Sequence, residues 1–265
     1  MTYLRPLIVL AVLAVVGWAG LRLFDPFGQP LLLQSVQAAP LEDGSDGSLA
    51  LFLTIDNRGG PDRLIAATAS DASETVLYAP EADGTIPLPG ASTPLLASDG
   101  AHIVLRGVEG PLDDGRLFPV SLIFEKAGTV TARARLAAPV SQGDATQSGL
   151  FGLGDICRVE EGEPAPAISL RTEARPDGAG WRVIVDAEEF TFSKEGADKE
   201  HIPGVGHGHL YVSGLKLGRL YGPQADIGPL PPGEHTVRVT LNTNDHRAYV
   251  VDDEPVTAEA TIVVK

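Results

Sequence analysis

The stretch LALFLTIDNRGGPDRL, residues 49–64, decides the fold class of this chain. Its first seven residues are apolar or β-branched, and the six that follow, DNRGGP at 56–61, are rich in turn-forming residues. Such a run bounded by Gly, Pro, Asn and Asp is typical of a β-strand that ends in a tight turn.

The pattern recurs along the whole chain. Further short runs lie at 31–36, 75–78, 102–105, 120–124, 129–134, 181–185, 190–192, 209–212, 235–241 and 258–264. No stretch of about 11 or more residues holds a helical period of 3.6. The 30 glycines and 21 prolines also favour short strands and turns over long helices. The sequence predicts an all-β protein, and its 265 residues are enough for two domains.

The charge and sulfur content exclude several classes of function. Lys and Arg number 20 against 35 Asp and Glu, a net charge of −15, whereas nucleic acids and anionic membrane surfaces require a basic face. Because Cys157 is the only cysteine, an intrachain disulfide and any multi-cysteine zinc or iron–sulfur cage are excluded. Met1 is the only methionine, so the exported part has no thioether ligand.

The N-terminus carries a membrane-directed segment, the uncharged run LIVLAVLAVVGWA at 7–19. It is either a signal peptide or an anchor that spans the inner membrane once. The best small-residue cleavage site, 36–38, lies well beyond the run, and the run with its flank reaches the ~20 residues that span a bilayer, so we favour the anchor. Arg5 then predicts a cytoplasmic N-terminus and periplasmic domains; cleavage would instead release the protein into the periplasm.

These features divide the chain into four parts. We predict an anchor or signal segment at 1–28, a first β domain at 30–138, a linker rich in Gly, Pro, Ser and acidic residues at 139–165, and a second β domain at 166–265.

Three stretches of the first domain carry a family resemblance: LTIDNRGGPDRL at 53–64, GAHIVL at 100–105, and residues 111–128. Together they resemble the periplasmic copper chaperone domain called PCuAC, and the resemblance covers most of residues 30–138. It implies a cupredoxin-like β-sandwich that carries Cu(I) toward cytochrome oxidase.

The resemblance implies a site of two histidines and two methionines, which this chain does not keep. Tyr78 stands at the first histidine position, His102 keeps the second, and Val104 replaces the methionine two residues on. Cu(I) is soft and prefers thioether or thiolate ligands, which the domain lacks. We therefore predict that this site is lost, that His102 is a hydrogen-bonded strand residue and at most a weaker ligand, and that Tyr78 packs.

Five of the six histidines lie between residues 201 and 246. The centre of this region is GHGHLYV at 206–212, and on a strand His207, His209 and Tyr211 point to one face. Side chains at i and i+2 lie about 6.6 Å apart along a strand, close enough to share a metal if a third ligand arrives from elsewhere.

The third ligand is expected at the end of a later strand. The strand 235–241 runs into NTNDH at 242–246, where loops gather functional groups. This order resembles the last part of CopC-type periplasmic copper proteins, which implies an Ig-like sandwich that binds Cu(II) through histidine and aspartate. Asp245 and His246 are the residues that this resemblance indicates.

We predict His207, His209 and His246 as metal ligands, with Asp245 ligating directly or orienting an imidazole. His201 is a further candidate because it precedes His207 closely, and His235 is a weaker one because it begins a core strand. Imidazole and carboxylate favour Cu(II), with Zn(II) next, and binding should weaken below pH ~6 as imidazoles protonate. Polar alternation on an exposed strand remains the alternative explanation of the His-x-His pattern.

No enzyme motif accompanies these histidines. The sequence contains no Gly-Lys-Ser/Thr phosphate loop and no Gly-x-Ser-x-Gly elbow, and no general base is evident beside the histidines. The sequence therefore predicts a membrane-anchored periplasmic copper-binding protein, not an enzyme, that acts as a chaperone or accessory factor. Its partners would be copper and a cuproenzyme such as cytochrome oxidase, or another copper carrier. Two alternatives are a metal-free β-sandwich adapter of the cell envelope and a metalloenzyme, in which the histidines would leave an open metal position for water.

Overall fold

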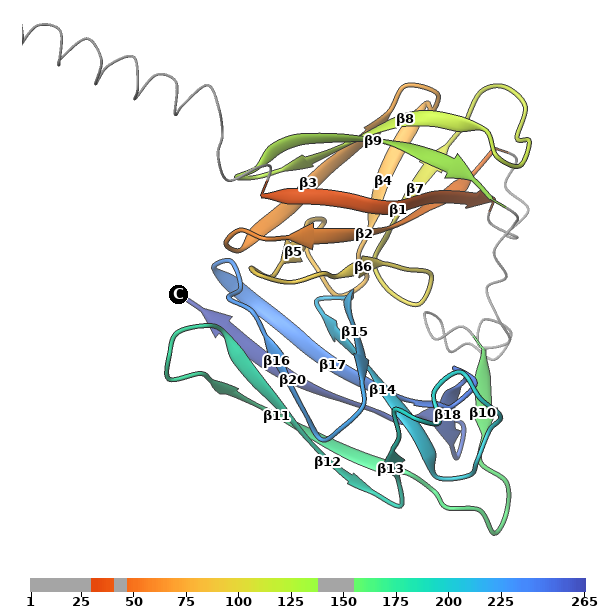
Figure 1. Cartoon of the computed structure of the whole chain (residues 1–265), viewed down its shortest axis with the longest axis vertical. Helices are drawn as coiled ribbons and strands as arrows, with labels where there is room; N and C mark the ends of the chain where they lie inside the picture. Colours follow the sequence, from red (N-terminus) through yellow and green to blue (C-terminus); the bar gives the residue numbers. More distant parts are fainter. Residues whose placement is uncertain (1–29, 41–46, 138–154) are drawn as a thin grey trace, which may run out of the picture. The chain divides into compact units, whose positions relative to one another are not determined.

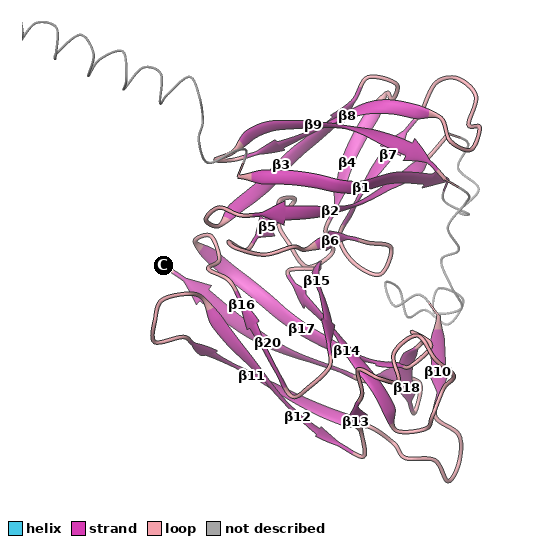
Figure 2. Ribbon diagram, viewed as in Figure 1, coloured by secondary structure: helices cyan, strands magenta, loops and turns pink. Residues whose placement is uncertain are grey.

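The computed structural model of the chain describes residues 30–40, 47–137 and 155–265 (Figure 1). These residues form strands, turns and loops without a helix (Figure 2), which confirms the prediction of an all-β protein built from β-sandwiches. The predicted membrane segment at 1–28 and the linker residues 139–154 lie outside the described residues. No helix in the described part of the chain has the length and apolar character needed to cross a membrane.

Residues 31–265 form one compact unit that contains two lobes. The N-terminal lobe, residues 31–137, has nine strands. They are β1 (Leu31–Pro40), β2 (Leu49–Asn57), β3 (Asp62–Ala69), β4 (Glu74–Tyr78), β5 (Ile86–Leu88), β6 (Leu95–Leu96), β7 (His102–Arg106), β8 (Leu117–Phe124) and β9 (Gly128–Leu136).

The strand and turn of residues 49–64 lie at the centre of the N-terminal lobe. Strand β2 pairs with β1, β6 and β7, while β3 pairs with β5 and β8, and a parallel pair between β1 and β9 joins the two layers. Leu51, Leu53 and Ile55 alternate into the core. The buried Asn57 then fixes the turn, because its side-chain amide donates to the carbonyls of Gly60 and Pro89.

The C-terminal lobe, residues 155–265, has eleven strands. They are β10 (Ile156–Arg158), β11 (Ala167–Ala174), β12 (Trp181–Glu188), β13 (Thr191–Phe192), β14 (Val205–Val212), β15 (Leu215–Leu220), β16 (Gln224–Ile227), β17 (Gly233–Thr243), β18 (Ala248–Val251), β19 (Glu254–Pro255) and β20 (Thr257–Val264).

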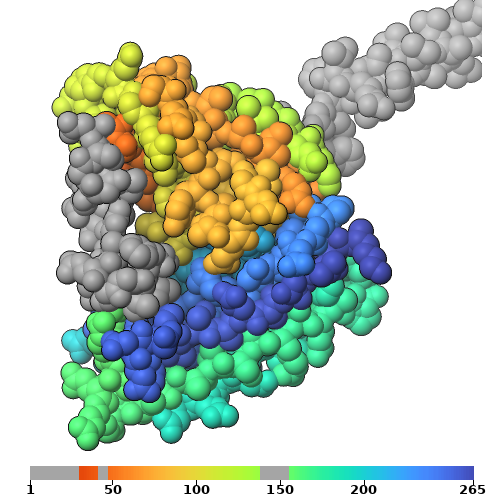
Figure 3. Space-filling view, turned by 180° about the vertical axis from the view of Figure 1, so that it is seen from behind, coloured from red at the N-terminus to blue at the C-terminus, as the bar shows by residue number. Residues whose placement is uncertain are grey.

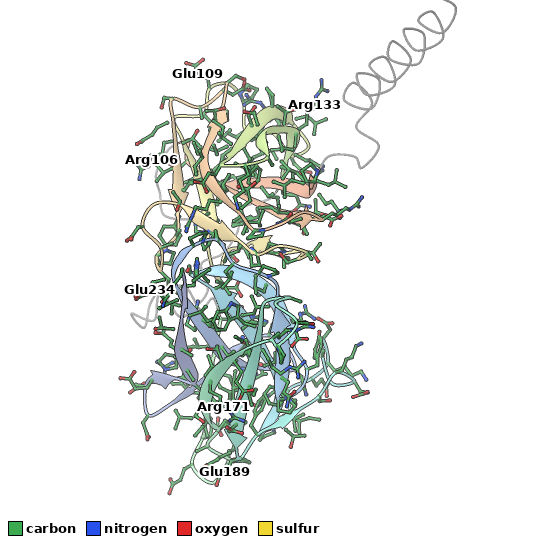
Figure 4. All side chains as sticks on the ribbon, turned by 90° about the vertical axis from the view of Figure 1, so that its left-hand side faces the viewer. Arg106, Glu109, Arg133, Arg171, Glu189 and Glu234 are labelled. Atoms are coloured by element: carbon green, nitrogen blue, oxygen red, sulfur yellow. The ribbon has the colours of Figure 1, made fainter. Side chains whose placement is uncertain are left out.

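Two sheets form the C-terminal lobe. One has the order β15-β14-β17-β20, and the other is the three-stranded sheet β11-β12-β16. Apolar side chains from both sheets fill the space between them, among them Val183, Val212 and Val239. Strand β20 also lies along β11, and their blue and green residues adjoin on the face shown in Figure 3. Charged side chains such as Arg171 and Glu189 point outward (Figure 4).

The central strand β14 is buried along nearly its whole length, and its glycines allow that packing. A Cβ atom added to Gly206 would lie 1.9 Å from the carbonyl oxygen of Asn242 on β17. Glycine is therefore needed here because the backbones of β14 and β17 approach too closely for any side chain.

We expect Gly206→Ala to lower the free energy of unfolding by about 1–3 kcal/mol or more, because the added methyl group must push β14 away from β17. Urea unfolding of the full chain measures this effect. Gly222→Ala is the matched control, since nothing lies within 4 Å of a Cβ at Gly222. Equal losses of stability in the two variants would contradict this explanation.

The region expected to be a linker contains a strand. Ile156 and Cys157 are buried in β10, which pairs in parallel with β18. The described part of this region, 155–165, thus begins inside the C-terminal lobe, although its sequence is rich in acidic residues and proline. Its three-residue strand was too short to stand out as a pattern.

The two lobes are joined by direct backbone contacts. Lys216 of β15 pairs with Leu95 of β6. The amide of Gly90 donates to the carbonyl of Pro229 at 2.8 Å, and the amide of Ala101 donates to the carbonyl of Gly214 at 2.7 Å.

Candidate metal centre

Strand β14 brings His207 and His209 together. They lie opposite Asn242 and Thr240 of β17, and both imidazoles occupy the face that the strand period predicts. Their Nε2 atoms are 3.1 Å apart, and their ring centroids are 5.0 Å apart. His207 is completely buried and His209 is 5% exposed, so the alternation of polar residues on an exposed strand face does not explain this pair.

The spacing of the two Nε2 atoms suits a shared metal ion. Zinc–imidazole bonds of about 2.0–2.1 Å place two nitrogens about 3.3 Å apart in a tetrahedron and about 2.9 Å apart at a right angle. The observed 3.1 Å lies between these values. Neither ring would have to move far to ligate one ion.

His246 supplies the third imidazole from the turn after β17. Its ring centroid lies 4.9 Å from that of His207 and 6.3 Å from that of His209. One nitrogen from each of the three histidines lies within 4.8 Å of the others. The backbone of His246 has φ of 73°, a conformation that a residue with a side chain rarely adopts and that often marks functional sites.

Two carboxylates each contact a ring nitrogen of one of these imidazoles. Asp99 lies 3.2 Å from Nδ1 of His209, and Asp198 lies 2.5 Å from Nε2 of His246. Asp198 also pairs with Arg219 at 3.2 Å. A carboxylate on the outer nitrogen is the usual way to orient a metal-binding histidine, because it fixes the tautomer and the ring plane.

Burial keeps the two strand histidines neutral. It lowers the pKa of His207 to about 3, helped by the neighbouring His209 and His246. It also lowers the pKa of His209 to about 4, although the hydrogen bond with Asp99 opposes this shift. Burial alone would raise the pKa of Asp99, but His209 and Lys216 hold it well below its usual range. At neutral pH these two imidazoles are therefore unprotonated and lie beside an ionised carboxylate.

The other predicted ligands lie outside this group. The carboxylate of Asp245 accepts from the Thr243 hydroxyl and pairs with Arg247 at 3.0 Å. Nε2 of His201 lies 3.8 Å from Sγ of Cys157. Nε2 of His235 donates to the carbonyl of Pro231 at 2.7 Å, the structural role expected of a residue that begins a core strand.

His102, which stands at a ligand position of the PCuAC resemblance, contacts residues of its own lobe. Nδ1 of His102 donates to the carbonyl of Gly100 at 3.0 Å. Its ring packs against Tyr78, with centroids 4.6 Å apart, and against Phe52, with centroids 5.8 Å apart. These contacts match the packing roles expected for His102 and Tyr78.

Sequence reasoning missed Asp99, Asp198 and Lys216. Asp198 lies 48 residues from His246, and Asp99 lies 117 residues from Lys216, with which it forms an ion pair. No local pattern marks these residues, because the fold alone brings them to the histidines. The contact between Cys157 and His201 was also missed, since Cys157 was assigned to a linker.

Comparisons with known proteins concern mainly the N-terminal lobe. Residues 33–140 match the model of the family described as "Putative lipoprotein LpqE-like". A protein of Leifsonia xyli subsp. xyli, "Putative lipoprotein Lxx21020", is 31% identical over 105 residues, which are 36% of this chain and 63% of that protein. The chain thus matches less than two thirds of this relative, and the matched family covers a region close to that of the PCuAC resemblance.

Two solved structures are also similar to part of the chain. The copper-bound PCuAC domain from PmoF2 is 26% identical, covering 42% of this chain and 94% of that domain, with a TM-score of 0.38. The Cu(I) form of DR1885 from Deinococcus radiodurans is 24% identical, covering 42% of this chain and 82% of that protein, with a TM-score of 0.32. The family match ends at residue 140, before the histidine cluster begins.

Proposed function

We propose that this protein binds copper in the bacterial cell envelope, with one Cu(II) ion held by His207, His209 and His246. The observation that carries the proposal is the convergence of three imidazole nitrogens within 4.8 Å of one another. Two of these rings are held by carboxylates, and two are buried.

The ligand set favours Cu(II) over Cu(I). All three donors are imidazoles, the only methionine is Met1, and Cys157 is not a member of the group. Imidazole suits both Cu(II) and Zn(II), and affinity for Cu(II) is usually the higher of the two. Zn(II) is therefore the competing ion.

The accessibility of His246 fits a role in copper handling. Its side chain is 32% exposed, whereas His207 is completely buried, so the ion would enter and leave past His246. A carrier needs such a replaceable ligand to pass copper to another copper carrier or to a cuproenzyme such as cytochrome oxidase. The resemblance of the N-terminal lobe to PCuAC domains agrees with this role, and we assign no catalytic step to the centre.

The proposed location rests on the N-terminal apolar segment, expected to be an inner-membrane anchor or a signal peptide. The matched family and relative are named lipoproteins, which agrees with an exported protein of the cell envelope. We propose that the apolar segment attaches the protein to the inner membrane, with both lobes in the periplasm.

Metal analysis of the full chain tests the proposal. We expect one Cu(II) per chain at pH 7 after exhaustive dialysis, with a d–d absorption band typical of nitrogen ligands. The triple variant His207→Ala/His209→Ala/His246→Ala should retain less than about a tenth of that copper. Absence of both Cu(II) and Zn(II) uptake by the folded wild-type chain would refute a metal role and support the adapter alternative.

A further inference from the structure

The loop that carries Asp99 belongs to the N-terminal lobe and is fixed against the C-terminal lobe. The amide of Ala97 donates to the carbonyl of Ala101 at 3.0 Å, and the amide of Gly100 donates back to Ala97 at 3.1 Å. The amide of Ala101 then donates across the lobes to Gly214 at 2.7 Å. A Cβ atom at Gly100 would lie 2.6 Å from the same Gly214 oxygen, so the loop lies directly on the turn after β14. Asp99 is thus held on a rigid backbone.

Asp99 meets three groups of the C-terminal lobe and is only 16% exposed at its side chain. The Tyr211 hydroxyl donates to it at 2.9 Å, the Lys216 ammonium pairs with it, and Nδ1 of His209 lies 3.2 Å away. An ionised carboxylate can only accept hydrogen bonds. The Lys216 ammonium, which can only donate, also lies 3.1 Å from Nδ1 of His209, so Asp99 and Lys216 compete for this nitrogen. Where Nδ1 donates its hydrogen to Asp99, the lone pair stays on Nε2, the nitrogen that faces His207.

We infer that Asp99 is a positioning residue for the metal centre, so that the centre is built by both lobes. Asp99 fixes the tautomer and the ring orientation of His209 from the N-terminal lobe, while the ligands come from the C-terminal lobe. This inference rests on the proposed metal-binding function. The N-terminal lobe, whose own copper ligands are degenerate, then contributes to copper binding through Asp99.

A purely structural ion pair between Asp99 and Lys216 is the competing explanation. It would hold the lobes together without any effect on the imidazole. Glu81 provides the matched control, because it also forms an ion pair between the lobes, and its partners are an arginine and a backbone amide instead of a histidine. Its carboxylate pairs with Arg238 at 2.8 Å and accepts from the amide of Gly214 at 3.0 Å.

The test compares wild type, Asp99→Asn and Glu81→Gln in the full chain. Nitrogen-15 NMR of the histidine rings reports the tautomer of His209 without metal, and Cu(II) titration reports affinity. We expect His209 to be protonated at Nδ1 in the wild type and to populate the Nε2-protonated form in Asp99→Asn. Loss of an outer carboxylate typically lowers metal affinity by about 10–100-fold, and Glu81→Gln should retain affinity within about 3-fold.

Each result separates the inference from the proposed function. If the wild type binds Cu(II) but Asp99→Asn binds it equally well, Asp99 does not position the ligand and the metal centre stands without it. If Asp99→Asn does not fold, the wild-type spectrum decides, since a His209 protonated at Nε2 overturns the inference. If the wild type binds no metal, the proposed function fails, while the tautomer comparison still reports whether Asp99 orients His209.

Discussion

Replacing His209 with alanine is expected to lower the affinity for Cu(II) by about 100-fold or more, which corresponds to roughly 2.7 kcal/mol of binding free energy. His209 combines the two properties that the centre requires. Its Nε2 lies 3.1 Å from Nε2 of His207, and its Nδ1 is held by Asp99. The loss therefore removes a ligand and leaves the Asp99 carboxylate with only Lys216 and Tyr211. Competition titrations against a chelator of known affinity measure the change.

The matched control is His102→Ala, which removes a half-buried strand histidine from the N-terminal lobe. His102 donates to Gly100 and packs on Tyr78, away from the three clustered imidazoles. We expect its Cu(II) affinity to stay within about 3-fold of wild type. Circular dichroism of both apo variants must show folded β structure. A folded His209→Ala variant with wild-type affinity would show that copper, if bound, uses other residues.

The sequence predicts that His207 and His209 lie side by side because local periodicity determines it. On a β-strand, His207 and His209 must share a face whatever the rest of the fold is. His246 could also be anticipated, since it follows the end of β17, whose residues Asn242 and Thr240 lie opposite the two histidines. These predictions depend only on neighbouring residues in the sequence, so they require no more than a correct assignment of the strands.

The outer carboxylates could not be predicted in the same way. The sequence favours Asp245 as the carboxylate beside His246 because the two residues are adjacent. In the structure, however, the Asp245 carboxylate forms an ion pair with Arg247. The residues that hold the imidazoles, Asp99 and Asp198, come from other loops. Their positions depend on how β14 packs against its surroundings and on how the lobes meet. Those are long-range features that no single stretch of sequence contains.

The same limit applies to β10 and to the lobe contact. Three residues, Ile156–Arg158, gain their strand conformation only by pairing with β18, more than eighty residues later. The bridge between Lys216 and Leu95 likewise joins strands of the two lobes. The composition of residues 139–165 indicates a linker, but β10 within this region belongs to the C-terminal lobe because it pairs with β18. Pairing with a distant strand thus outweighs the local sequence preference of these residues.

The apo protein is expected to lose several kcal/mol of stability as the pH falls from 6.5 to about 4, and His207 and His209 are the main cause. Burial lowers the pKa of His207 to about 3 and that of His209 to about 4, whereas both have a pKa near 6.5 in the unfolded chain. Between these values the unfolded chain binds protons that the folded chain does not. Stability therefore rises with pH in this window and is fully present above 6.5.

Each histidine can contribute a slope of up to about 1.4 kcal/mol per pH unit, and the sum is smaller than two independent terms because the rings interact. Burial also lowers the pKa of His102 and of His235, which adds to the slope in the same direction. The double variant His207→Gln/His209→Gln isolates the contribution of the cluster. Urea unfolding at pH 7, 6, 5 and 4.5 should give a flatter profile for this variant than for wild type.

Saturating Cu(II) should oppose the first part of the loss, below pH 6.5, because the ion binds the neutral imidazoles of the folded state and adds its binding free energy to stability. The protection should fade toward pH 4, where protons on the unfolded chain and on the ligands compete with the ion. Identical pH profiles for wild type and the double glutamine variant would mean that the buried imidazoles do not control acid stability. In that case the low pKa values would no longer support ligands kept neutral by burial.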